Sequence, residues 1–162
     1  MIDFEKLGVH LASQSGDVAA LNKLVADGED PNLPDCRGNT PLKYAAAEAQ
    51  ILTVNRLLEL DVDINFADNR GFTPLHCAAA HGFLEDSLEV VRALLLQGAR
   101  ADVISTKMSY TVLHEARSVP ILDLLLQQGA PIAHVDSDGL TAAERQRENG
   151  HYEEASFLFE RA

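Results

Sequence analysis

The chain has 162 residues, of which 46% are hydrophobic, and this is enough for one domain with a continuous core. Its formal net charge of −12 argues against nucleic acid and anionic membrane surfaces as partners, because both repel an acidic protein, and it favours a basic partner. The amino terminus, MIDFEKLGVHLASQSGD, has no apolar run, so we expect neither a signal peptide nor a membrane span, and two cysteines are too few for a secreted disulfide framework. We therefore expect a cytoplasmic protein with free thiols.

Three stretches of the sequence are alike: GNTPLKYAAAEA from Gly38, GFTPLHCAAAHG from Gly71 and SYTVLHEA from Ser109. One threonine marks the register of four units, and it recurs as Thr40, Thr73, Thr111 and Thr141. Its spacings are 33, 38 and 30 residues, and counting back 33 residues from the first reaches Leu7, where LGVHLASQSGD keeps the histidine, the alanine and the glycine. We expect five units in one domain, with boundaries near 7–39, 40–72, 73–110, 111–140 and 141–162.

Each unit begins with a predicted helix. The threonine can cap this helix, and in two units a proline follows at the first helical position, where its missing N–H costs nothing. A histidine stands three residues after the threonine position, as His10, His76 and His114. It can bond back across the first turn as Glu does in a capping box, so these histidines are predicted to have a structural role.

A second helix follows in each unit, with apolar residues at helical spacing. Glycine is expected to end it at Gly28, Gly98 and Gly129, while Asp61 takes this place in the second unit. Between units stand DCRG, DNRG and DSDG, which have the composition of tight turns. Each unit is thus predicted as a turn, a helix and a second helix.

This arrangement resembles the ankyrin-repeat family, whose pattern DxxGxTPLHxAAxxG is matched best by residues 68–80. The resemblance covers roughly residues 7–162, although the first unit lacks the Thr-Pro pair and the last, TAAERQRENGHYEEASFLFERA, ends with its second helix as terminal caps do. It implies an all-α ankyrin-repeat solenoid of stacked helix-turn-helix units with projecting β-turn fingers. It also implies a concave face that binds other macromolecules.

A metal site is the alternative interpretation of GFTPLHCAAAHG, which brings together His76, Cys77 and His81. A zinc site needs three or four converging ligands, yet the other cysteine lies a full repeat away and the family pattern already accounts for His76. Paired acids such as Glu153 and Glu154 stand beside no nucleophile, base or phosphate loop. We expect no metal, no cofactor and no catalysis.

Three departures from the repeat cluster in the third and fourth units. The third unit is longer by five residues, mostly at FLEDS, 83–87, between its helices. The fourth is shorter by three, which removes about one turn from its first helix before Pro120 starts the second. The turn between them reads TKMS, 106–109, without the Asp and the Gly of its siblings, so this finger should be reshaped. Such clustering favours a functional region over neutral change in a tolerant loop.

A row of large side chains follows the turns, at the position between the glycine and the threonine. The family places this position outward, so the rings of Phe72 and Tyr110 are predicted to anchor a partner. The alternative is that each ring lies flat against the next finger. Tyr44 and Met108 are expected as neighbours, with a polar rim around them. The candidate partner-binding residues are Arg37, Asn39, Tyr44, Arg70, Phe72, Cys77, His81, Phe83, Lys107, Met108, Tyr110 and Leu140.

Together these observations predict a non-catalytic protein–protein interaction module that is a monomer when free. It would act as an adaptor through the concave face of the finger and helix surface. The alternative is an inhibitor or immunity-type protein that neutralises a basic enzyme or toxin by covering its active site. The two functions differ in whether the captured partner loses activity.

Overall fold

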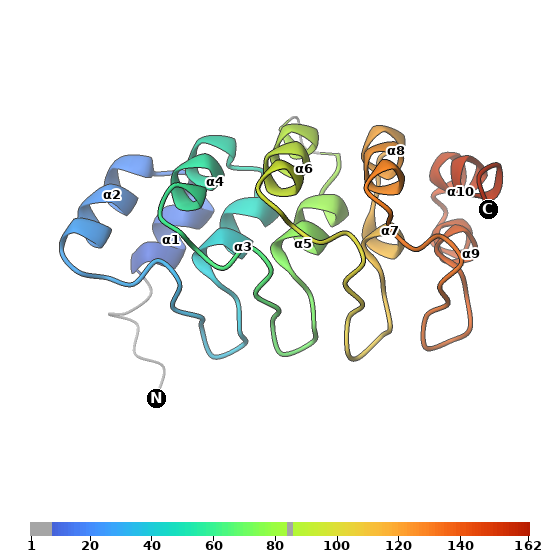
Figure 1. Ribbon diagram of the computed structural model, residues 1–162, viewed down its shortest axis with the longest axis horizontal. Coiled ribbons are helices and arrows are strands. Elements are labelled where there is room, and N and C mark those ends of the chain that lie inside the picture. Colours follow the sequence, from blue (N-terminus) through green and yellow to red (C-terminus); the bar gives the residue numbers. More distant parts are fainter. Residues whose placement is uncertain (1–7, 84–85) are drawn as a thin grey trace.

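The computed structural model describes residues 8–83 and 86–162, which form ten helices arranged as five antiparallel pairs side by side (Figure 1). The helices are α1 (Gly8–Ser15), α2 (Val18–Ala26), α3 (Pro41–Ala47), α4 (Ile51–Leu58), α5 (Pro74–Ala80), α6 (Ser87–Leu96), α7 (Val112–Glu115), α8 (Val119–Gln127), α9 (Ala142–Glu148) and α10 (Tyr152–Phe159). The all-α solenoid predicted from the sequence is confirmed. Position 7, where the first unit was expected to begin, lies outside the described residues.

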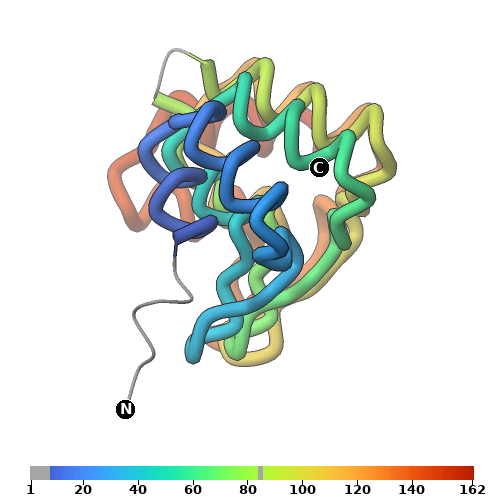
Figure 2. The backbone as a smooth tube through the Cα atoms, turned by 90° about the vertical axis from the view of Figure 1, so that its left-hand side faces the viewer, coloured from blue at the N-terminus to red at the C-terminus, as the bar shows by residue number. Residues whose placement is uncertain are grey.

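The helices form two layers with loops projecting from one edge (Figure 2). The inner row runs α1, α3, α5, α7, α9, and the outer row runs α2, α4, α6, α8, α10, with each helix touching its neighbours in the row. Four loops, the fingers, extend away from both layers at residues 35–39, 68–72, 105–110 and 136–140 (Figure 1).

One apolar core runs along the whole stack between the two rows. Its largest fully buried side chains include Leu21, Leu42, Leu57, Leu75, Leu94, Leu113, Leu122, Leu125 and Leu158. The inner helices pack closely because small residues recur on their buried sides, as Ala45, Ala46, Ala78, Ala79, Ala142 and Ala143. Each pair therefore depends on its neighbours to bury its apolar surface, as in other repeat solenoids.

The predicted helix starts are confirmed. Thr40, Thr73, Thr111 and Thr141 are the N-caps of α3, α5, α7 and α9. His76 and His114 complete capping boxes, because their Nδ1 atoms accept the N–H of the capping threonine at 3.3 and 3.2 Å. In α9 the same place is taken by Glu144, and in α3 by Lys43, which closes no such box.

The predicted helix ends are confirmed as well. Gly28, Gly98, Gly129 and Asp61 all have positive φ, between 56° and 96°. The strongest demand for glycine is instead in a finger. A Cβ on Gly71, which also has positive φ, would lie 2.4 Å from the backbone nitrogen of Thr106, so the next finger can approach only because no side chain is present.

Candidate protein-binding surface

Three fingers are folded by an aspartate that binds its own loop. The carboxylate of Asp35 accepts the N–H groups of residues 37 and 39, each at 2.8 Å, and Asp68 accepts those of residues 70 and 72 at 2.8 and 2.9 Å. Asp136 repeats the pattern at 2.9 and 3.1 Å. Burial opposes ionisation of these carboxyls, but their hydrogen bonds outweigh it and lower the pKa of all three. The aspartates therefore shape the fingers and are not free for a partner.

The finger at 105–110 is reshaped, as predicted. Its closing bond joins the N–H of Ser105 to the carbonyl of Tyr110 at 2.8 Å, so it spans one residue more than its siblings. The hydroxyl of Ser105 accepts the N–H of Tyr110 at 2.9 Å in place of the aspartate, and Ser109 adopts the positive φ that glycine has elsewhere. The altered sequence is accommodated by substitute contacts of the same kind.

Neighbouring fingers are joined backbone to backbone. The N–H of Asn69 donates to the carbonyl of Arg37 at 3.1 Å, that of Thr106 to the carbonyl of Arg70 at 2.9 Å, and that of Ser137 to the carbonyl of Met108 at 3.0 Å. These bonds place the finger tips in one continuous row. Exposed residues at matching places in the row are Arg37, Arg70 and Lys107.

A second set of contacts ties the inner helices α1 and α7 to the finger that follows each. Since its Nδ1 accepts a backbone N–H, His114 carries its proton on Nε2, which donates to the carbonyl of Leu140 at 3.2 Å. His10 donates in the same way to the carbonyl of Asn39 at 3.2 Å. His76 is fully buried, and burial lowers its pKa to about 4. The predicted structural role of the three histidines is confirmed for His76 and His114, while the bond of His10 reaches the next finger.

Lys43 replaces the histidine in the second pair, and sequence reasoning missed its role. Its ammonium group forms an ion pair with Asp68 in the next finger and donates to the carbonyl of Phe72 at 3.2 Å. Only 4% of Lys43 and 7% of Asp68 are exposed. The sequence signal that could have revealed this role is TPLK in place of TPLH. It puts a cation at the position where other pairs have the histidine.

The predicted row of outward anchors is corrected. Phe72 is 6% exposed, because its ring packs edge-on against His76 at a centroid distance of 5.4 Å while the guanidinium of Arg70 covers it at 5.0 Å. Tyr110 is half-buried and stacks on His114 at 5.2 Å. These rings pack on the inner helix beneath them, and not flat against the next finger. Asn39 and Leu140 at the matching places are half-buried.

The surface of the inner helices carries a different residue in each pair, at the place after the histidine position. Tyr44 donates its hydroxyl to Asp35 at 2.9 Å, and Cys77 is a half-exposed thiol whose pKa burial raises to about 11. Glu115 follows, and burial raises its pKa despite the nearby positive charges of Arg117, Arg70 and His81. Glu115 and Arg117 are not among the residues predicted from the sequence, because no repeated pattern marks them.

The remaining candidates lie beside this surface. His81 ends α5, with its Nδ1 3.0 Å from the carbonyl of Cys77, and the ring of Phe83 lies against it at 5.9 Å. Phe83 is 69% and Met108 42% exposed. The predicted long loop, 83–87, lies partly outside the described residues, since 84–85 are among those not described.

The predicted shortening of the fourth unit is confirmed. Helix α7 has four residues, whereas α3, α5 and α9 have seven each. After α7 the chain turns toward α5, and the N–H of Arg117 donates to the carbonyl of Ala79 at 3.2 Å. The amide of Gln146 in α9 is buried and donates to carbonyls of the short helix segment. These are the carbonyls of Leu113 at 3.3 Å, His114 at 3.1 Å and Ala116 at 2.7 Å.

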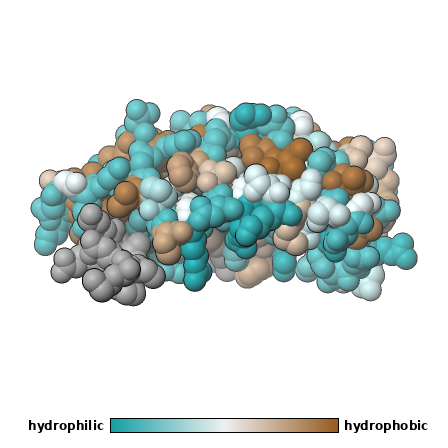
Figure 3. Space-filling model, turned by 90° about the horizontal axis from the view of Figure 1, so that it is seen from below, coloured by the Kyte–Doolittle hydropathy of each residue, from teal (hydrophilic) through white to brown (hydrophobic). Residues whose placement is uncertain are grey.

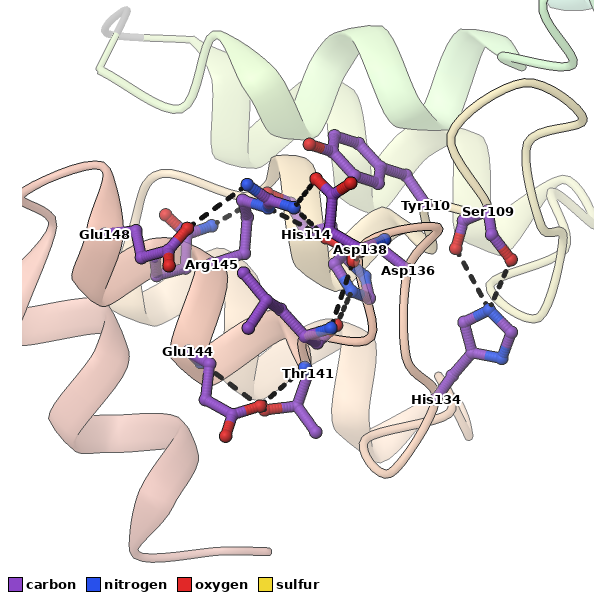
Figure 4. A network of polar contacts seen from close by, with 12 residues as sticks. Ser109, Tyr110, His114, His134, Asp136, Asp138, Thr141, Glu144, Arg145 and Glu148 are labelled. Carbon is purple, nitrogen blue, oxygen red and sulfur yellow. Dashed lines mark hydrogen bonds and ion pairs between the residues drawn. The ribbon is translucent and has the colours of Figure 1, made fainter.

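The last finger is closed by charges from its own pair (Figure 4). The guanidinium of Arg145 lies 2.7 Å from a carboxylate oxygen of Asp136, 2.5 Å from Asp138 and 3.3 Å from Glu148. Arg145 also lies over the ring of Tyr110, at 5.8 Å. This finger tip therefore uses its charges internally.

Among residues 8–83 and 86–162, no three His, Cys, Asp or Glu side chains are grouped so that they could hold a metal ion. The described thiols, Cys36 and Cys77, are both free. Within these same ranges, no helix is long and apolar enough to cross a membrane.

Comparison with known proteins agrees with this architecture. Residues 9–105 match the family described as ankyrin repeats, in three copies. No curated protein matches the sequence. Because the match covers more than half of a chain built from stacked helix pairs and fingers, this chain belongs to the ankyrin-repeat family.

Proposed function

We propose that this chain is a single ankyrin-repeat domain of five units that binds a partner protein, as an adaptor, through its fingers and inner helices. Ankyrin repeats generally serve as protein–protein interaction modules, and the family is typically non-catalytic. The proposed surface comprises the fingers at 35–39, 68–72 and 105–110 together with α3, α5 and α7.

The division between repeated and variable positions carries this proposal. Buried positions repeat from pair to pair, as in Leu42, Leu75 and Leu113. The neighbouring surface position instead changes from a phenol to a thiol to a carboxylate, at Tyr44, Cys77 and Glu115. A repeated scaffold with a varied surface is the arrangement by which solenoids form extended binding faces.

Capture from a lysate of the source organism tests the location of the surface. The bait is compared with a triple variant of the finger and inner-helix surface, Tyr44→Ala with Lys107→Ala and Met108→Ala. The control is a triple variant of the outer helices, Leu52→Ala with Arg92→Ala and Leu96→Ala. We expect the first variant to lose the protein that the bait captures and the second to keep it. Loss with the outer variant alone would place the binding surface on the other face.

The alternative function, inhibition of a basic enzyme or toxin, is favoured by the net charge of −12. An activity assay on the captured protein separates the two functions. An inhibitor suppresses the activity of its partner in proportion to the complex formed, whereas an adaptor leaves it unchanged.

A further inference from the structure

The charge of the proposed binding surface differs from that of the whole chain. Residues 35–48, 68–81 and 105–117, which form the three fingers and the inner helices α3, α5 and α7, contain five of the 13 Lys and Arg residues but only four of the 25 Asp and Glu residues. The acidic excess therefore lies in the outer helices, the connecting loops and the two ends of the chain.

Most acids of this surface are already occupied. Asp35 accepts hydrogen bonds from its own finger, and Asp68 is buried against Lys43. Glu115 is half-buried, and burial raises its pKa. The nearby charges of Arg117, Arg70 and His81 oppose this rise. Glu48 is exposed at the end of α3, where it accepts a hydrogen bond from Gln14 at 3.3 Å.

Four of the five cations, all except Lys43, are by contrast exposed. Arg37, Lys107 and Arg117 form no ion pair with any other residue in the described ranges. Arg70 lies 3.5 Å from Asp68, whose charge Lys43 already balances, and its side chain is 60% exposed. The finger row brings the first three tip positions together, and the short α7 places Arg117 beside α5. These four residues, Arg37, Arg70, Lys107 and Arg117, are the cationic strip.

The charges next to a bound partner affect its binding more than the net charge of the whole chain does. Exposed charges are screened over roughly 8 Å at physiological ionic strength, and one helix layer is about 10–12 Å thick. Acids on the outer helices are therefore too far away to cancel the strip for a partner seated on the fingers. Seen from the finger tips, this side of the molecule is mainly hydrophilic, with apolar side chains in small separate patches (Figure 3). Its recognition chemistry is accordingly polar.

We infer that the cationic strip binds an extended acidic segment of the partner protein, whose Asp or Glu carboxylates pair with Arg37, Arg70, Lys107 and Arg117. This inference rests on the proposed function, because it names the chemistry of the segment that the finger surface holds. It reverses the expectation from net charge alone, which pointed to a basic partner. Carboxylates suit the strip because the planar fork of Arg can bind them bidentately.

Three peptides of equal length test the inference: alternating Asp and Ala, alternating Lys and Ala, and alternating Ser and Ala. Each is titrated into isotopically labelled protein, and amide chemical shifts report the site. We expect the Asp peptide to shift the amides of the three fingers and of residues 115–117, with binding that weakens as salt rises. The other two peptides should leave them unchanged.

Two triple variants with the same change in net charge give the matched comparison. Arg70→Gln with Lys107→Gln and Arg117→Gln removes charge from the strip, and Lys23→Gln with Arg56→Gln and Arg92→Gln removes it from the outer helices. We expect the first variant to lower the affinity for the Asp peptide about tenfold and the second to lower it by less than about twofold. Each exposed ion pair contributes only a fraction of the binding energy. Thermal melts confirm that both variants are folded.

The outcomes separate this inference from the proposed function. Binding of the Lys or the Ser peptide at the fingers in preference to the Asp peptide would overturn the acidic specificity and leave the finger surface as the binding site. Shifts confined to the outer helices would overturn both. The absence of any shift with the Asp peptide, or an equal loss in the two triple variants, would also overturn the inference.

Discussion

The second and the last finger, at 68–72 and 136–140, solve one electrostatic problem in opposite ways. Both contain a loop-folding aspartate that needs a cation. Asp68 receives Lys43 from the preceding inner helix, deep between two pairs, whereas Asp136 receives Arg145 from the inner helix of its own pair, 14% of whose side chain is exposed. The first arrangement joins two repeats and leaves Arg70 exposed at the tip. The second arrangement joins the finger to the inner helix of the same repeat and also pairs with Asp138. The comparison therefore distinguishes an ion pair that connects neighbouring repeats from ion pairs that stabilise one repeat at the end of the stack.

The largest expected effect is on the buried pair of the second finger. Lys43→Met leaves Asp68 buried without its cation, so we expect the free energy of unfolding to fall by about 3–5 kcal/mol. Urea titration followed by circular dichroism measures the loss. Lys23→Met on exposed α2 is the control and should change it by less than about 0.5 kcal/mol. An equally small change for Lys43→Met would mean that the second finger does not depend on its buried cation.

The ring of the second finger comes next. Phe72→Ala removes a buried ring that packs on His76, and we expect a loss of about 3 kcal/mol in the same titration. Leu140→Ala at the matching place of the last finger, where the side chain is half-buried, should cost only about 1 kcal/mol. If Phe72→Ala left stability unchanged and weakened partner binding, the ring would be an exposed anchor and its burial would be contradicted.

The pH dependence distinguishes the same two regions. Neutral His76 has a pKa of about 4 in the folded chain and about 6.5 when unfolded, so the unfolded chain binds the extra proton between these values. The contribution of His76 to stability is therefore full above pH 6.5 and falls by about 3 kcal/mol as the pH drops to about 4, and His10 and His114, whose pKa values burial also lowers, act in the same direction. His76→Gln, which keeps the capping geometry, should flatten this part of the profile.

Glu144→Gln, at the matching place in α9, is the control for the pH profile. The pKa of Glu144 is lowered from its ordinary value by hydrogen bonds from Thr141, so its contribution is lost only in more acidic solution. The slope between pH 6.5 and 4 should survive in this variant. If it disappeared, the titrating group would lie in the last pair and not at His76.

The smallest expected effect is at the last finger. Arg145→Met removes the ion pairs with Asp136 and Asp138, and we expect a loss of about 2 kcal/mol in urea titration, because Asp138 is exposed and water can enter beside Asp136 at the partly exposed place that Arg145 leaves. A loss as large as that of Lys43→Met would erase the distinction between the two fingers.

Sequence reasoning succeeded where the signal was local. The threonine caps, the positive-φ helix ends, the aspartate turns and the short α7 each depend on residues within a few positions of one another. These local features are enough to predict the repeated helix pairs and the positions of the fingers.

It failed where the deciding contact lay between distant elements. Phe72 was predicted to point outward because the family places this position outward, but its ring packs against His76 and Arg70. Lys43 and Asp68 are 25 residues apart in the chain, and no pattern within one repeat pairs them. Net charge likewise averages over faces that differ, so composition alone could not locate the cationic strip on which the proposed acidic specificity rests.

The hydrogen bonds from Gln146 to the α7 segment affect the order in which the chain folds. The carbonyl of Ala116 is satisfied by a side chain 30 residues further along, so the fourth pair cannot complete its hydrogen bonds until α9 has been synthesised and docked. During synthesis from the amino end, the first three pairs can stack as they emerge, whereas α7 must wait. The region that bears Glu115 and Arg117, on the proposed binding surface, is thus completed only after α9 has emerged from the ribosome.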